Sequence, residues 1–259
     1  MAINTAKTKF IVFRTRGKRV GPNDCNLVYN DNEIGVQEDP NLIYPINRVH
    51  NDGDEKSFKL LGVLFDEYLT FEDHISNVCT KISKSLFCLN RIKNFVTNAA
   101  MKSLYYAMVH SHVAYCVNIY GCATATALNR LVLKQKEAIR IVCHAGYRDH
   151  TNPLFKKLGI LPLNEFIKYS ALKFMHKFKH RRLPFTFNDT WLTNRARNPE
   201  LILRNADNLY VPAHNLASIK RFPLFTFPKI WNEDVNNKLH PSPYIYLKSV
   251  KSALLNSLV

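Results

Sequence analysis

The apolar pattern of the chain changes its period near residue 70, and this change sets the fold class. Upstream, runs of β-branched and aromatic residues at Lys9–Phe13 and Lys59–Phe65 are typical of short strands. Downstream, from Ile75 to Ile92, apolar residues recur at steps of three and four over five turns, which is typical of an amphipathic helix. The sequence therefore predicts an α+β fold, mostly α, with a small β-rich part first.

The β-rich part contains a long polar stretch. Residues 20–57 are rich in Asn, Asp, Pro and Gly and indicate hairpins and loops, with short strands expected at Leu27–Tyr29 and Ile43–Arg48. Asp66–Tyr68 is expected to turn before the helix. Thr70 and Asp73 resemble a capping box, which would mark the start of that helix.

Two more amphipathic helices follow, at about residues 98–116 and 126–144, and Gly121 and Gly146 lie near their ends. Three amphipathic helices with short connections predict a small helical bundle. Gln135 falls on the inward face of the third helix. It is then a polar residue at a helix–helix contact.

The C-terminal part is less regular. We expect a turn and connector at Pro153–Pro162, and a helix at Leu163–Lys179 with Pro162 near its first turn. After Pro184 the scattered aromatics, Asn and Pro predict an irregular extension to about residue 240, which orders against a partner. A last helix is expected at Tyr244–Leu258.

The charge balance points to a polyanionic partner. Basic residues outnumber acidic ones, 36 to 20, and the formal net charge is +16, with the excess spread along the chain. A folded domain with this balance most simply binds nucleic acid, although a generally basic surface or sequence drift would also produce it. The candidate phosphate contacts lie on the predicted helices: Lys81, Lys84, Arg91, Lys93, Lys134, Lys136 and Arg140.

The six cysteines include no C-x-x-C pair, and Cys143, His144 and His150 fit no standard zinc spacing, so no metal site is predicted. The chain shows neither a leader nor an apolar run of about eighteen residues. We expect an intracellular protein, nuclear or cytoplasmic, that does not enter membranes.

Several motifs occur in an order that belongs to one family. They are Ile3–Thr8 with Lys7, then Leu61, Gly62, Val63, Asp66, Leu69, His74 and Ile75, then Leu104, Tyr105, Val109, Val113, Tyr115, Tyr120 and Gly121, and finally Leu131, Gln135, Lys136, Ile139, Arg140 and Val142. Taken in this order, they resemble the reverse transcriptases of non-LTR retrotransposons of the jockey and chicken-repeat type. Tyr120 stands where the family usually has Trp.

The resemblance implies an architecture and roles for residues. Residues 1–70 would be a palm remnant, 71–150 a helical thumb and 151–259 a helical and irregular extension. Lys7 would lie near the nucleotide phosphates, and Leu61, Gly62 and Val63 would form the primer grip. Considered alone, Lys7 is better explained as a solvated surface lysine, and Gly62 is explained equally well as a bulge in a strand. The implied partners are RNA, RNA–DNA hybrid and the missing N-terminal polymerase half.

The family's paired catalytic aspartates have no counterpart, because no two Asp residues are adjacent anywhere in the chain. Reverse transcription needs Mg²⁺ held by clustered carboxylates. We therefore expect no catalytic residue and no cofactor in this chain, with Mg²⁺ and polymerase activity belonging to the full-length parent. A 5′-truncated copy of an element is the expected origin.

Two other functions stay open on the sequence alone. One is a nonfunctional truncated copy, and the other is a domesticated module that binds a protein through its C-terminal extension. The aromatic-rich region 169–187 likewise has two explanations: it stacks on nucleic-acid bases, or it packs in the core.

Overall fold

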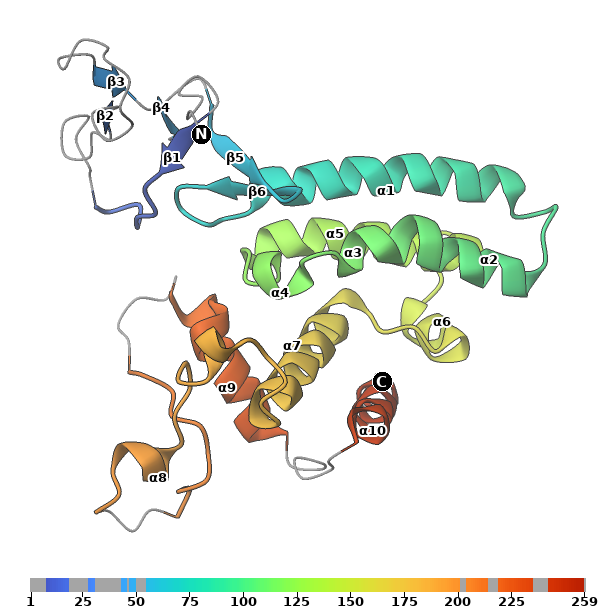
Figure 1. Cartoon of the computed structure of the whole chain (residues 1–259). Coiled ribbons are helices and arrows are strands. Elements are labelled where there is room, and N and C mark those ends of the chain that lie inside the picture. The colour runs from blue at the N-terminus through green and yellow to red at the C-terminus, as the bar shows by residue number, and fades with distance from the viewer. Residues whose placement is uncertain are drawn as a thin grey trace. The chain divides into compact units, whose positions relative to one another are not determined.

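The structure is a computed structural model that describes residues 8–18, 28–30, 43–45, 47–49, 55–200, 204–213, 219–234 and 242–258. The chain divides into two compact units, residues 1–74 and 75–259. Most of the described residues are helical and the sheets are small, which confirms the mostly α, α+β class (Figure 1). The three-part division implied by the family resemblance stays a prediction.

The first unit contains three two-stranded sheets. β1 (Lys9–Ile11) pairs in parallel with β4 (Asn47–Val49), and β2 (Val28–Asn30) pairs antiparallel with β3 (Ile43–Pro45). The strands expected at the N-terminus and in the polar stretch are therefore present. The first is shorter than predicted, and the expected strand Ile43–Arg48 is two strands.

The predicted single strand Lys59–Phe65 is wrong, because the segment folds back on itself. β5 (Ser57–Leu60) and β6 (Val63–Asp66) pair antiparallel, with Leu60 opposite Val63. Leu61 and Gly62, which connect them, both have positive φ, of 47° and 86°. Positive φ at both central residues is the geometry of a two-residue hairpin turn, so Gly62 belongs to a turn and not to a bulge.

Asp66 organises the turn between β6 and the first helix. Its carboxylate accepts hydrogen bonds from the hydroxyl and N–H of Thr70, at 3.0 and 3.1 Å, and from the N–H of Phe71 at 2.8 Å. These contacts hold a tight path in which Leu69 and Phe71 have positive φ. Thr70 then accepts from the N–H of Glu72, so it caps the helix through Glu72 and not through Asp73.

A buried ion pair ties the ends of the first unit together. Arg14 donates from Nε and Nη2 to the two carboxylate oxygens of Glu67, each at 2.9 Å, and its N–H also donates to the Glu67 carbonyl. The Glu67 side chain is fully buried. A two-pronged guanidinium–carboxylate contact of this kind fixes both distance and orientation.

Helices make up the second unit. In chain order they are α1 (Glu72–Ile92, whose first residues belong to the first unit), α2 (Asn98–Tyr105), the π-helical turn η2 (Tyr106–His110), α3 (Ser111–Ala114), α4 (Val117–Tyr120), α5 (Ala125–Val142), α6 (Thr151–Leu158), α7 (Leu163–Lys179), the 3-10 turn η3 (Phe185–Phe187), α8 (Asn194–Arg197), the 3-10 turn η4 (Ile219–Arg221), α9 (Pro223–Glu233) and α10 (Pro243–Asn256). Among the described helices, none is long and apolar enough to cross a membrane.

The three predicted amphipathic helices are present as α1, the run α2–η2–α3, and α5. Their inward residues are fully buried, as predicted: Ile82 and Leu89 of α1, Tyr105 of α2, and Leu131 and Ile139 of α5 are at 0% exposure. The second helix ends at Ala114, short of the predicted end at residue 116, because Tyr115 is extended, with ψ of 118°, and Cys116 after it has a left-handed φ of 54°.

Two predictions for the C-terminal part are wrong. The expected connector at Pro153–Pro162 contains helix α6, in which Pro153 lies in the first turn, where a missing N–H costs no hydrogen bond. The expected irregular extension contains α9, and several of its large side chains are buried. Trp191, Leu209, Phe227 and Trp231 pack with α7 and α10 in one core, so this segment is ordered by the chain itself.

One hydrogen bond explains how α9 tolerates a proline in its interior. Pro228 has no N–H and cannot bond to the carbonyl of Leu224 one turn earlier. The indole Nε1–H of Trp191 donates to that carbonyl instead, at 2.9 Å. The contact also gives the buried indole its partner.

Candidate nucleic-acid interface

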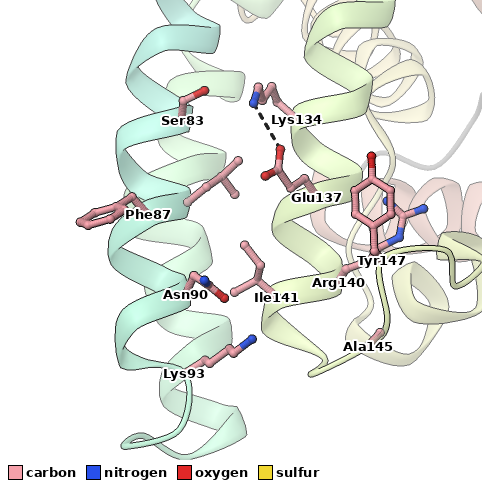
Figure 2. A pocket seen from close by; sticks show the side chains of 11 residues that line it. Ser83, Phe87, Asn90, Lys93, Lys134, Glu137, Arg140, Ile141, Ala145 and Tyr147 are labelled. Carbon is pink, nitrogen blue, oxygen red and sulfur yellow. Dashed lines mark hydrogen bonds and ion pairs between the residues drawn. The ribbon is translucent and has the colours of Figure 1, made fainter.

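A groove runs between α1 and α5 in the second unit. Its volume is about 480 Å³, and Lys93, which directly follows α1, lines it with Lys134 and Arg140 of α5 (Figure 2). Glu137 is the one acidic residue among the lining side chains, so the groove has a net formal charge of +2. Three of the seven predicted phosphate contacts therefore line one surface.

The α5 wall of the groove is held by local hydrogen bonds. Lys134 contacts Glu137 at 3.2 Å, one turn along the helix. Arg140 donates from Nε to the carbonyl of Asp149 at 3.1 Å, and its own carbonyl accepts from the N–H of Ala145 at 2.9 Å. These bonds fix the loop that brings Tyr147, whose side chain is largely exposed, to the rim.

The remaining predicted cations lie outside the groove. Lys84 and Arg91 are exposed on α1, and the Arg91 guanidinium lies 5.2 Å from the ring centre of Phe87. That ring points away from α5 in Figure 2. Lys81 lies beside His112, whose pKa is lowered by burial and by the Lys81 charge. Lys136 is half-buried on α5 and does not line the groove.

Sequence reasoning missed Arg130, which extends the basic seam between the two helices. Its Nη2 donates to the Ser76 hydroxyl of α1 at 2.5 Å. Burial raises the pKa of the nearby Cys79 thiol, while the charges of Arg130 and Lys134 act to lower it. The sequence did indicate this position, because Arg130 lies four residues before Lys134 and therefore on the same face of the predicted helix.

The expected primer-grip residues occupy the β5–β6 hairpin of the first unit. Leu61 is 82% exposed at its tip, whereas Val63 is buried. Lys7 lies outside the described residues. Among the residues that the structure does describe, no group of three or more His, Cys, Asp or Glu is placed to hold a metal ion.

Comparison with known proteins gives two partial matches. Both are RNA-directed DNA polymerases from the mobile element jockey: that of Drosophila melanogaster is 23% identical over 126 residues, and that of Drosophila funebris is 27% identical over 130 residues. These stretches cover 47% and 49% of this chain. This chain is therefore similar to these RNA-directed DNA polymerases over about half its length.

The relationship has a limited extent. The matched stretch spans 14% of the length of each jockey polymerase. No family model matches the chain. No solved structure matches it either.

Proposed function

We propose that the chain binds nucleic acid as the last part of a non-LTR retrotransposon reverse transcriptase, covering the end of the palm, the primer grip and the thumb. The observation that carries the proposal is the α1–α5 groove, which Lys93, Lys134 and Arg140 line. The partial likeness to jockey polymerases supports it.

The chemistry of the groove suits a phosphate backbone. Cations on two packed helices can neutralise successive phosphates and release the counterions bound to them, which supplies most of the sequence-independent affinity for nucleic acid. Lys134 and Glu137 partly neutralise each other, so an incoming phosphate competes with the Glu137 carboxylate for Lys134. RNA–DNA hybrid and RNA are the proposed partners.

Polymerase activity belongs, in this proposal, to a full-length parent. The N-terminal half of that parent would supply the carboxylates that hold Mg²⁺, since this chain has no adjacent Asp pair. The hairpin with Leu61, Gly62 and Val63 would contact the primer. Lys7 would approach the nucleotide phosphates, and Lys81, Lys84, Arg91 and Lys136 would add contacts beyond the groove.

Salt dependence of binding tests the proposal. Fluorescence anisotropy with a labelled RNA–DNA hybrid should give a log–log slope of affinity against salt at least as steep as about −2 to −3, because the three groove contacts contribute roughly 0.7 to 0.9 each and contacts beyond the groove add to them. The double variant Lys93→Gln/Lys134→Gln should make the slope shallower by about 1.4 to 1.8.

A matched control removes the same charge elsewhere in the unit. Lys229 of α9 and Lys248 of α10 are exposed, and the variant Lys229→Gln/Lys248→Gln should leave the slope close to that of the wild type. A wild-type slope near zero, or equal losses in both double variants, would exclude the groove as the binding surface.

A further inference from the structure

Three helices of the second unit end in the same kind of turn. In each, the first or second residue after the helix end has a left-handed φ, and the N–H of the residue that follows it bonds back to a carbonyl five residues earlier. The left-handed residues are His144 after α5, Gly159 after α6 and Arg181 after α7, with φ of 54°, 63° and 51°. Gly is the usual residue at this position, and His is among the tolerated ones, whereas Arg is not.

Arg181 therefore occupies a strained backbone position that a glycine would fill without steric strain. The chain uses glycine in the same turn after α6. Arg182 closes the α7 turn by bonding to the Lys177 carbonyl at 2.8 Å, so the geometry does not depend on the Arg181 side chain. The strain points to a use for that side chain outside the fold.

The Arg181 side chain faces an open polar surface. A hollow of about 400 Å³ is lined by Phe178, Lys179, Arg181, Asn188 and Asp189. Among the ion pairs of the described residues, none involves Lys179 or Arg181. Two cations thus share the hollow with one carboxylate and one amide, and further positive charge lies beside it at Lys177 and Arg182.

The aromatic side chains of this region divide into two groups. Phe174 packs against Phe187 with ring centres 5.6 Å apart, and Phe178 packs against Trp191 at 5.1 Å. Core packing therefore accounts for these rings. Phe185 is different, because it is 83% exposed on the turn η3, between the α7 end and Asn188.

We propose that the end of α7 is a second binding site, specific for single-stranded nucleic acid. Lys179 and Arg181 contact successive phosphates, the Asn188 amide donates to the backbone, and an unpaired base stacks on Phe185. Charge complementarity selects the polyanion, and the exposed ring selects unpaired bases, since stacking on a side chain needs a base whose face is free. The site lies apart from the α1–α5 groove and does not depend on it.

Arg181→Gly gives the sharpest test, because it should improve folding and impair binding. Loss of the left-handed strain should raise the melting temperature by about 2–4 °C. The affinity for a labelled oligo(U) RNA should fall about fivefold in 0.1 M salt, and the salt slope should become shallower by about 0.7, the value for one phosphate on a single strand. Arg181→Lys should keep the affinity and the slope.

Phe185→Ala tests the stacking contact without changing charge. It should lower the affinity for oligo(U) and leave both the salt slope and the affinity for a blunt RNA–DNA duplex unchanged. An unchanged oligo(U) affinity in both Arg181→Gly and Phe185→Ala would overturn the site. The double variant Lys93→Gln/Lys134→Gln, measured in parallel, tests binding at the groove alone. Each of the two proposed binding surfaces is therefore tested by variants that leave the other unchanged.

Discussion

The side-chain amide of Gln135 donates a 3.0 Å hydrogen bond to the hydroxyl of Tyr105, and this contact joins α5 to α2 inside the core. The same nitrogen donates to the Leu161 carbonyl at 3.0 Å, and the Gln135 oxygen accepts from the N–H of Leu163 at 2.7 Å. Leu163 is the first residue of α7, so Gln135 satisfies one of the N–H groups that a helix start leaves free.

Gln135→Leu should destabilise the second unit by about 3 kcal/mol. The change keeps most of the volume but leaves three buried polar groups, on Tyr105, Leu161 and Leu163, without a partner, and each costs roughly 1–3 kcal/mol before relaxation. Chemical denaturation followed by circular dichroism would measure it. Asn129→Ala, on the exposed face of α5, is the control and should change the free energy of unfolding little. Equal stabilities of the two variants would contradict the role assigned to Gln135.

The β5–β6 turn should become more stable when Leu61 is replaced by Asn. Leu61 is exposed and has a left-handed φ, which costs roughly 1–2 kcal/mol for most residues and less for Asn. Leu61→Asn should therefore slow hydrogen exchange at the amides of β5 and β6. Gly62→Ala should act in the opposite direction, since φ there is 86°. The same sign of change for both variants would refute the assigned turn.

Glu137→Gln should raise the affinity for an RNA–DNA hybrid. The change removes the one acidic group that lines the groove and frees Lys134, which Glu137 contacts at 3.2 Å. We expect a gain of severalfold at low salt, which fades as salt is raised because screening weakens the repulsion. Anisotropy titrations at two salt concentrations would measure it. The matched control is Glu165→Gln, which removes a carboxylate paired with Lys168 on α7. If Glu165→Gln raised the affinity for the hybrid as much as Glu137→Gln does, the gain would result from the net charge of the chain and not from the groove.

Alkaline pH should weaken the fold through Cys122. Burial raises the pKa of this thiol from 9.0 to about 11, although the Arg221 charge acts in the opposite direction. Between these values the unfolded chain loses the proton and the folded chain keeps it, so the free energy of unfolding falls as pH rises, by about 2–3 kcal/mol in total.

Urea titrations at pH 8.5 and 10.5 would show the loss of stability, and Cys122→Ala should reduce that loss. Burial also raises the pKa of Tyr105 and Tyr120, so part of the loss should survive in the variant. An equal loss in the variant and the wild type would refute the part assigned to Cys122.

The purified chain should extend no primer at any Mg²⁺ concentration. Two-metal phosphoryl transfer depends on clustered carboxylates, and the chain has no adjacent Asp pair. Incorporation of labelled nucleotide on an RNA template, compared with a buffer control, is the measurement. Template-dependent incorporation would contradict the truncated-thumb proposal, and Asp66, Glu72 and Asp73 would then be the first residues to replace.

The helical periodicity by itself determined α1, α5 and α7, and α7 begins and ends at the predicted residues, Leu163 and Lys179. Such helices are amphipathic: apolar residues at intervals of three and four form one buried face. Tertiary contacts bury this face and do not change the helical structure that the spacing predicts. The inward position of Gln135 followed from the same pattern. The motif order likewise predicted the partial likeness to jockey polymerases.

Only the tertiary structure decided three features that the spacing of apolar residues does not encode: the β5–β6 hairpin, helix α9 and the groove. The hairpin at Leu61 and Gly62 interrupts what is, by composition, one β-type run, and the turn depends on two left-handed residues of which one is Leu. Helix α9 carries a proline in its interior and persists because Trp191, 33 residues upstream of Leu224, takes over the freed carbonyl. The groove depends on which side chains of α1 and α5 lie opposite each other. A sequence specifies the buried face of each helix without specifying how two helices pack.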